Sequence, residues 1–421
     1  MKVVHIVNLD ILGGAAKAAS ALNKALIGIG VDSTLLVQNK FGKDEHVSSI
    51  SYNFVEKLKT TVRIILDIVQ MKTFTKIKKG RFSFGNIGID ISKNKLIQEA
   101  DIIHLHWINQ GYLSIKSLLK LVKLRKPIVW TLHDMWAFTG GCHYNSGCKN
   151  YFESCGHCPY LIFASRKDFS KNIFIAKKKL YEKLNINFIT CSEWLASIAA
   201  QAPLIKDKTV QPIHNTLDIN IYKPMDQNDV RKMYNLPEDK FLILFVSLSI
   251  SEERKGFVYL KNSLLHILQK YPSLSSQIEI LILGKSSSEQ FQEIPFKINQ
   301  AGRIKDDREV AQYYNAANVF LAPSLEDNLP NTVLESLSCG TPVVAFKVGG
   351  IPEMVEHKGN GYLAEVRSFE DFANGIYWMF QNRNQLNDMR LNARNKIVEQ
   401  FNPQLIANTH LSFYKRQLKN R

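Results

Sequence analysis

The chain has 421 residues, of which 45% are hydrophobic and 22% are charged, so it is long enough for two hydrophobic cores and has a globular composition. Its net charge of +16 is uneven, because residues 1–210 hold 30 Lys and Arg against 15 Asp and Glu, and the remainder holds 24 against 23. This composition excludes a disordered chain. Four interpretations of the basic half stay open: it binds nucleic acid, an anionic membrane surface or a phosphorylated substrate, or it is a solvated face with no partner.

Short apolar runs alternate with helical patterns through the first half. Strands are expected at residues 3–7, 33–37, 102–107, 128–132, 188–191 and 210–213, and a helix at residues 15–27. This alternation predicts a parallel sheet covered by helices on both faces. Gly13 and Gly14 open the first helix, where backbone N–H groups can meet a ligand, although a glycine pair is also ordinary turn chemistry.

Residues 55–81 mix apolar side chains with lysine and arginine. A basic amphipathic helix of this kind suits an anionic membrane surface. An ordinary helix with a solvated basic face explains the pattern almost as well. No apolar run reaches the ~18 residues of a membrane span, and the first residues turn polar too quickly for a secretory signal, which predicts a cytoplasmic protein, peripheral at the membrane if this helix binds it.

His133 and Asp134 directly follow the expected strand at residues 128–132. Open α/β sheets bind ligands at the carboxyl edge of their strands, which makes His133 a candidate site residue. A lone histidine is more often structural.

Four of the six cysteines lie in a glycine-rich insert at residues 140–160. They are Cys142, Cys148, Cys155 and Cys158, and the last two have the C-x-x-C spacing of a zinc knuckle. In a reducing compartment this clustering favours a structural zinc site. The alternatives are reduced thiols, a disulfide formed only on oxidation, or His143 or His157 in place of one thiolate.

The pattern of strands and helices restarts after polar residues near 215–237. Strands are expected at residues 241–246, 278–283, 296–301 and 319–322, and helices at residues 257–269 and 309–316. This pattern predicts a second doubly wound unit, and a helix at about 404–421 is expected to cross back onto the first. Arg254 and Lys255 follow the first strand of this unit, where two fixed cations can neutralise a leaving diphosphate. A solvated basic turn is the alternative.

Residues 324–344 join a strand end, a polar loop, a helix and another strand. Asn331 or Thr332 is expected to cap this helix, and Gly340 with Pro342 is expected to end it. A helix N-terminus attracts a diphosphate, and Glu335, one turn further in, can accept hydrogen bonds from ribose hydroxyls. The run therefore predicts a nucleotide-sugar site.

Taken together, five motifs resemble the GT-B fold retaining glycosyltransferases of family 4 (glycosyl transferases group 1), of the bacterial surface-polysaccharide type. The motifs are Gly13-Gly14, the segments at residues 131–134, 214–218 and 254–257, and the run at 324–344. The resemblance implies two Rossmann-like domains that face each other across a cleft. The predicted divisions are an acceptor-side domain at residues 1–215, a nucleotide-sugar domain at 216–400 and a returning helix at 401–421.

The resemblance also implies roles for single residues. Gly13 and Gly14 would lie against the donor diphosphate and acceptor, and His133 would bind a sugar hydroxyl. Glu335 aligns with the second acid of an E-x7-E motif, and Asp327 stands where the first acid is expected, one methylene shorter, unless Glu326 replaces it. The remaining implied donor contacts are the backbone amides of Asn328, Leu329 and Asn331, the backbone of Ile304 at the nucleobase, and Glu353.

The family usually has an arginine where this chain has Ile250, so Arg254 is expected to take over that role. The resemblance implies a nucleoside diphosphate sugar donor, a glycan or polyprenyl-phosphate-linked acceptor and no catalytic metal. A noncatalytic, membrane-associated assembly protein with the same fold is the alternative function, supported by the changes at Ile250 and Asp327. A nucleic-acid binder is not expected, because the basic half has no recognisable reading motif.

Overall fold

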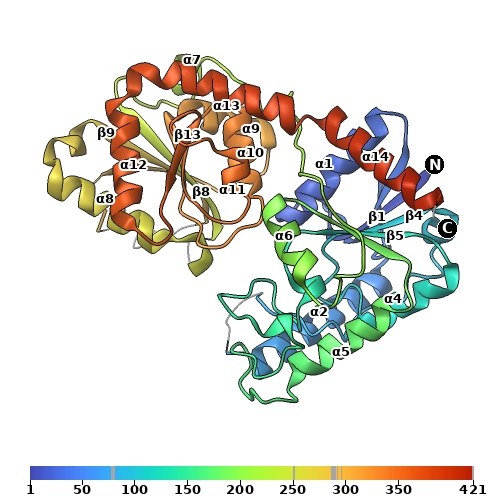
Figure 1. Cartoon of the computed structure of the whole chain (residues 1–421). Coiled ribbons are helices and arrows are strands. Elements are labelled where there is room, and N and C mark those ends of the chain that lie inside the picture. Colours follow the sequence, from blue (N-terminus) through green and yellow to red (C-terminus); the bar gives the residue numbers. More distant parts are fainter. Residues whose placement is uncertain (77–80, 250–251, 286–290, 292, 295, 420–421) are drawn as a thin grey trace. The chain divides into compact units, whose positions relative to one another are not determined.

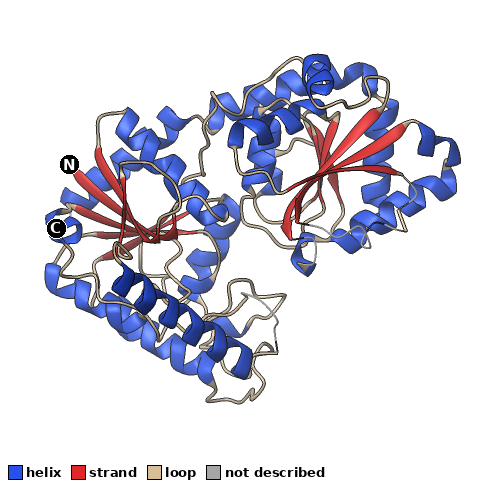
Figure 2. Ribbon diagram, turned by 180° about the vertical axis from the view of Figure 1, so that it is seen from behind, coloured by secondary structure: helices blue, strands red, loops and turns tan. Residues whose placement is uncertain are grey.

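The computed structural model describes residues 1–76, 81–249, 252–285, 291, 293, 294 and 296–419. The chain forms two compact units, Met1–Thr216 with Pro403–Arg421, and Leu217–Asn402 (Figure 1). Each unit has one parallel β-sheet between layers of helices, and Figure 2 shows the two sheets as separate sets of strands. The doubly wound α/β prediction is therefore confirmed.

The first unit contains a seven-stranded sheet in the order β3-β2-β1-β4-β5-β6-β7. Its strands are β1 (Lys2–Leu9), β2 (Asp32–Asn39), β3 (Val47–Ser49), β4 (Ile102–Leu105), β5 (Ile128–Leu132), β6 (Ile186–Thr190) and β7 (Val210–Pro212). Its helices are α1 (Gly14–Gly28), α2 (Phe54–Phe74), α3 (Lys95–Glu99), α4 (Ile115–Leu121), α5 (Phe169–Tyr181), α6 (Glu193–Gln201) and α14 (Pro403–Lys419).

The second unit repeats this arrangement with six strands in the order β10-β9-β8-β11-β12-β13. Its strands are β8 (Phe241–Ser249), β9 (Ile278–Lys285), β10 (Lys297–Gly302), β11 (Val319–Ala322), β12 (Val343–Phe346) and β13 (Gly361–Ala364). Its helices are α7 (Gln227–Met233), α8 (Phe257–Lys270), α9 (Asp307–Ala316), α10 (Asn331–Ser338), α11 (Ile351–Met354), α12 (Phe369–Gln381) and α13 (Leu386–Gln400).

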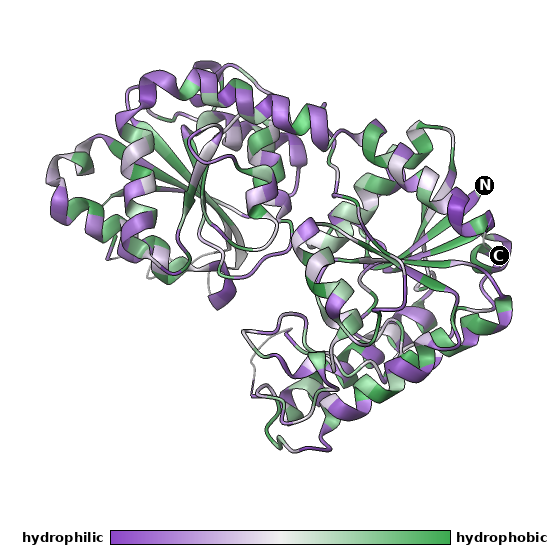
Figure 3. Ribbon diagram, in the orientation of Figure 1, coloured by the Kyte–Doolittle hydropathy of each residue, from purple (hydrophilic) through white to green (hydrophobic). Residues whose placement is uncertain are grey.

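Both sheets are buried on two faces, which explains why their strands read as short, nearly continuous apolar runs. In Figure 3 the strands are coloured mostly as hydrophobic, whereas the helices around them carry both hydrophilic and hydrophobic residues. All four residues of β4, β11 and β12 are buried. The last helix, α14, packs beside α1 and places Ile406, Phe413 and Tyr414 in the core of the first unit.

In each sheet the strand order reverses at one point, between β1 and β4 and between β8 and β11. Open α/β sheets bind ligands outside the carboxyl ends of the strands at such a switch point. Ligand sites are therefore expected at the loops after β1 and β4 in the first unit, and at the loops after β8 and β11 in the second.

Candidate functional site

The loops after β8 and β11 are in direct backbone contact. Gly256 ends the turn after β8 with φ +69°, and a Cβ at this position would lie 1.8 Å from the carbonyl oxygen of Pro323. The backbone N–H of Leu325 donates to the carbonyl of Arg254 over 2.8 Å. Only glycine permits this approach, and it brings the predicted cations to the loop that follows β11.

Arg254 and Lys255 meet at one buried carboxylate. Lys255 Nζ lies 2.8 Å from Asp327 Oδ2, and Arg254 Nη1 lies 3.1 Å from the same oxygen. Arg254 Nη1 also donates to the carbonyl of Glu326 over 2.7 Å. Burial acts to raise the pKa of Asp327, but Lys255 and Arg254 outweigh it, and the pKa lies below its usual value. Asp327 is therefore a charged partner that holds both cations in place.

A second glycine turn supports the backbone of this loop. Gly349 has φ +56°, and a Cβ there would lie 1.6 Å from the carbonyl oxygen of Asp327. Gly350 donates its N–H to the carbonyl of Asn328 over 2.6 Å. Helix α11 begins directly after this turn and carries Glu353, which is partly exposed. The contact explains how Asn328 and Leu329, both buried, are fixed in a loop without regular structure.

Helix α10 begins differently from the prediction. Pro330 occupies the N-cap position and no side chain caps the helix, so the expected cap by Asn331 or Thr332 is wrong. Proline has a preset φ and needs no hydrogen-bond partner for its nitrogen, which suits it to a helix start. The predicted helix end is confirmed, because α10 stops at Ser338 and Gly340 follows with φ +76°.

Glu335 lies on α10 and is only 6% exposed. Its Oε2 accepts a hydrogen bond of 3.0 Å from the hydroxyl of Tyr314 on α9. Burial and the neighbouring Glu335 raise the pKa of Tyr314 well above its ordinary value, so this hydroxyl stays protonated and donates. Ile304 lies apart from this group, after β10 at the edge of the sheet. Ile250 lies outside the described residues.

At the switch point of the first unit, Gly13 precedes helix α1 with φ +94°, and Gly14 is the first residue of the helix. No atom lies within 4 Å of a Cβ built on either glycine, so the space beside this turn is open. The positive φ explains the glycine at position 13. At position 14 the absence of nearby atoms leaves room for a ligand.

His133, directly after β5, lies at the end of a chain of imidazoles that includes His5 within β1 and His106 directly after β4. His5 Nδ1 is 2.9 Å from His106 Nε2, and His106 Nδ1 is 3.1 Å from His133 Nε2. Burial lowers the pKa of His5 to about 3 and that of His133 to about 4, with Asp134 acting in the opposite direction on His133. These rings are therefore neutral at physiological pH. A pocket of about 240 Å³ adjoins His133, His106 and His214.

The next residue, Asp134, is fixed by three donors. Trp107 Nε1 lies 3.0 Å and His143 Nδ1 2.7 Å from Asp134 Oδ2, and the backbone N–H of Trp136 lies 2.8 Å from Oδ1. Burial opposes the charge of Asp134, but His143 and the other partners lower its pKa. His143 belongs to the cysteine-rich insert, so the insert reaches the neighbour of His133.

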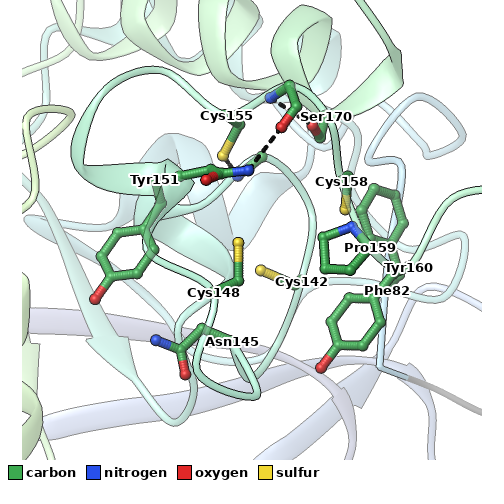
Figure 4. A pocket seen from close by; sticks show the side chains of 13 residues that line it. Phe82, Cys142, Asn145, Cys148, Tyr151, Cys155, Cys158, Pro159, Tyr160 and Ser170 are labelled. Carbon is green, nitrogen blue, oxygen red and sulfur yellow. Dashed lines mark hydrogen bonds between the residues drawn. The ribbon is translucent and has the colours of Figure 1, made fainter. Parts of the chain in front are cut away.

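The four cysteines of the insert line one pocket of about 340 Å³ (Figure 4). All are free thiols. Burial raises the pKa of Cys142 and of Cys155 to about 12 and that of Cys158 to about 11. The structure thus places all four predicted metal ligands around one pocket.

Comparisons with known proteins identify the second unit. Residues 240–382 match the family model described as glycosyl transferases group 1. This part of the chain is a glycosyl transferases group 1 domain. The chain is also 25% identical over 365 residues to the putative colanic acid biosynthesis glycosyl transferase WcaC of Escherichia coli strain K12, across 84% of this chain and 85% of that protein. The chain is thus a glycosyltransferase.

A second curated relative is a D-inositol 3-phosphate glycosyltransferase of Thermobifida fusca, 28% identical over 182 residues, which are 40% of this glycosyltransferase and 41% of that protein. Two solved structures share the fold over whole chains. They are a sucrose-phosphate synthase from Thermosynechococcus elongatus (TM-score 0.68, 18% identity, 100% of both chains) and Anabaena Alr3699/HepE in complex with UDP-glucose (TM-score 0.65, 17% identity, 99% and 100%).

Several polar residues near His133 and Glu335 in this glycosyltransferase were not among the predicted site residues. His104 and His106 alternate along a strand, so they face the same side, and that spacing was a readable signal. His104 Nε2 lies 2.7 Å from Thr131 Oγ1, and its Nδ1 lies 2.6 Å from the hydroxyl of Tyr414 on α14. His5 and Tyr314 gave no such signal, because their partners are distant in sequence.

Asp327→Asn should destabilise the glycosyltransferase near neutral pH. The pKa of Asp327 is lowered in the folded state, so its charge adds stability above the unfolded value of about 3.9, and this contribution disappears as pH falls through the folded pKa. We expect a loss of ~1.5–3 kcal/mol near pH 7 that shrinks below about pH 4. Urea unfolding over this pH range measures it.

The matched control is Glu252→Gln, because Glu252 pairs with Arg254 from a side chain that is 44% exposed. An exposed pair contributes little, so this variant should unfold like the wild type. An Asp327→Asn protein with unchanged stability at neutral pH would contradict the role of Asp327 as partner of the two cations.

Proposed function

We propose that this glycosyltransferase moves a sugar from a nucleoside diphosphate donor to a hydroxyl of a glycan or lipid-linked acceptor, with retention of anomeric configuration. The observation that carries the proposal is the position of Arg254 and Lys255 beside Asp327 at the switch point of the second sheet. Two cations held by one buried carboxylate form a preorganised site for the diphosphate. In a solvated basic turn, the alternative, the two cations would not need a buried carboxylate as their partner.

The chemistry follows from charge development. As the bond between the anomeric carbon and the phosphate oxygen breaks, negative charge grows on the leaving diphosphate, and Lys255 and Arg254 stabilise it more strongly than they stabilise the bound donor. The acceptor hydroxyl attacks the oxocarbenium-like carbon from the same face and passes its proton to the leaving phosphate. Asp327 acts by holding the cations, and the backbone around Asn328, Leu329 and Asn331 contributes amide dipoles near the start of α10.

Glu335 is proposed to hold the ribose of the nucleotide, since its carboxylate is buried and oriented by Tyr314. Ile304 and Glu353 are proposed as further donor contacts. In the first unit, the neutral ring of His133 is proposed to bind a sugar hydroxyl, and the open turn at Gly13 and Gly14 to receive the diphosphate and the acceptor.

Two further observations support the donor and the pathway class. The structures of Anabaena Alr3699/HepE with the same fold are described as complexes with UDP, with UDP-glucose, and with UDP and glucose. WcaC is named for colanic acid biosynthesis, which favours surface polysaccharide assembly as the setting.

The test is a panel of nucleotide sugars. A donor that binds only the folded protein raises the apparent melting temperature, so thermal shift selects the donor. Transfer to short glycan and polyprenyl-phosphate-linked acceptors is then followed by release of the nucleoside diphosphate, and NMR of the product gives the anomeric configuration. Absence of binding and of nucleotide release across the panel would overturn the proposal, and an inverted product would overturn the retaining mechanism.

Helix α2 supports a membrane-bound acceptor. Seven large apolar side chains on it are between 47% and 79% exposed, namely Phe54, Val55, Leu58, Val62, Ile65, Leu66 and Val69. Lys57, Lys59, Arg63 and Lys72 lie on the same helix. An apolar face with basic residues beside it fits the surface of an anionic bilayer. Lys78 and Lys79 lie outside the described residues, and within the described ranges no helix is long and apolar enough to span a bilayer.

We expect the protein to co-sediment with phosphatidylglycerol vesicles, and less strongly as salt increases. Leu58→Asp with Ile65→Asp should lower the vesicle affinity at least about 10-fold, because two apolar groups that would enter the bilayer become charged. The matched control is Met233→Asp with Leu391→Asp, since both residues are 61% exposed and lie on the second unit. Equal vesicle binding by the two double variants would contradict the membrane role of α2.

A further inference from the structure

The cysteine-rich insert has little regular structure but a strictly held backbone. Between β5 and α5 the described elements are two short 3-10 turns, Trp136–Phe138 and Asn150–Phe152. Three successive residues, Cys155, Gly156 and His157, have positive φ values of 58°, 96° and 46°. Non-glycine residues adopt this conformation only where surrounding contacts enforce it. The backbone N–H groups of Cys155 and His157 donate to the carbonyls of Asn150 and Ser165 over 2.8 and 2.7 Å, and a bound ion would add a cross-link between these turns.

Four thiols occupy the centre of this insert. Cys142, Cys148, Cys155 and Cys158 come from separate turns, and their sulfur atoms point toward the same space in Figure 4. A backbone amide already faces one of them, since the N–H of Gly140 donates to Cys155 Sγ over 3.2 Å. Backbone N–H groups commonly donate hydrogen bonds to metal-bound thiolates.

We infer that Cys142, Cys148, Cys155 and Cys158 bind one structural zinc ion. Four thiols are the usual closed ligand set for tetrahedral zinc, and the ion would close the insert as a cross-link. Each thiol loses its proton on binding, so one Zn²⁺ replaces four protons and the site carries a net charge of −2. The zinc would be a structural ion that takes no part in sugar transfer, so this inference does not depend on the proposed function.

A buried lysine lies at the insert, where a zinc-thiolate site would carry negative charge. Lys177 on α5 is fully buried, and its Nζ donates to the carbonyls of Trp136 and, over 3.0 Å, Thr139. Its ammonium lies 3.5 Å from the centroid of the Trp136 ring. A lysine held at this point of the insert would offset the negative charge of a zinc-thiolate centre.

A second metal-ligating cluster fits zinc less well. Among the residues that the structure describes, His5, His104 and His106 are the set whose ligand atoms lie within 4.8 Å of one another. However, most of their ring nitrogens already bond to His133, Thr131, Tyr414 or each other. The cysteines do not meet this spacing, so their sulfur atoms must move closer together when zinc binds at Zn–S distances of about 2.3 Å.

The test uses the full chain purified without chelator. We expect about one zinc per chain by mass spectrometry of metals, and a Co²⁺-substituted protein with the strong visible absorption of a tetrahedral thiolate centre. Cys155→Ser should lose the zinc and the cobalt spectrum. Cys339→Ser, which changes a buried thiol in the second unit, should retain both.

If Cys155→Ser fails to fold, the wild type still decides the question. Chelation should release the zinc and lower the melting temperature of the first unit, and added Zn²⁺ should restore it. Less than about a tenth of a zinc per chain with four titratable thiols in the insert, or an intact mass that shows disulfides in freshly purified protein, would overturn the inference.

Discussion

Lys255→Ala is expected to lower kcat for sugar transfer by about 100- to 1,000-fold, equivalent to ~3–4 kcal/mol of transition-state stabilisation. Lys255 Nζ is fixed 2.8 Å from Asp327, so it is preorganised for the charge that develops on the leaving diphosphate. The affinity for the nucleoside diphosphate should fall less than kcat, because the charge is smaller in the bound donor. Steady-state kinetics and calorimetric binding of the diphosphate separate the two effects.

The matched control for this variant is Lys261→Ala. Lys261 lies on α8 of the same unit and pairs with Glu293, whose side chain is 74% exposed. It should keep the kcat of the wild type. Lys255→Arg should recover part of the lost rate, since it restores the charge with a different geometry. A Lys255→Ala protein that folds and transfers sugar at the wild-type rate would remove Lys255 from the mechanism.

Glu335→Gln is expected to weaken binding of the nucleoside diphosphate by about 10- to 150-fold, which corresponds to ~1.5–3 kcal/mol for hydrogen bonds to a charged group. The carboxylate of Glu335 is buried and oriented by Tyr314, so a neutral amide changes its charge with little change in shape. Isothermal calorimetry with the diphosphate measures the effect, and KM for the donor should rise while kcat changes less.

Two other variants separate binding from positioning. Tyr314→Phe keeps the carboxylate but removes its donor, so its affinity loss should be smaller than that of Glu335→Gln. Glu399→Gln, at an exposed position near the end of α13, should bind like the wild type. Equal affinities of Glu335→Gln and Glu399→Gln would show that Glu335 does not hold the nucleotide.

The fold could be predicted from the sequence because buried parallel strands appear in it as short, local runs of apolar residues. The strands at residues 3–7, 128–132 and 319–322 fall within β1, β5 and β11, and each prediction used only neighbouring residues. Strands β3 and β13 were not predicted. They have three and four residues, too few for a clear periodic signal.

The site could be predicted only in part, because its contacts join residues that are far apart in sequence. Asp327 and Lys255 are 72 residues apart, and only the pairing of β8 with β11 brings their loops together. In the same way, His5 lies opposite His104 because β1 pairs with β4 in that register. Spacing along the chain identified the cations and acids as candidates. It did not show that Asp327 binds the cations directly.

The expected side-chain cap of α10 failed for a local reason. Asn331 and Thr332 are good capping residues, but Pro330 already holds the backbone in the conformation of an N-cap, with φ −68° and ψ 121°. The helix therefore starts one residue earlier than a capping asparagine would allow. A preference for capping residues was outweighed by the restricted backbone of proline.

Helix α14 has a consequence for synthesis on the ribosome. It supplies Phe413 and Tyr414 to the core of the first unit, and the Tyr414 hydroxyl bonds to His104, yet it is translated after the whole second unit. The first unit therefore cannot complete its hydrophobic core until about 190 further residues have been made, and part of its apolar surface stays exposed until then. During that interval the nascent chain is a natural client for chaperones, and ribosomes that stall before α14 would release a product prone to aggregation.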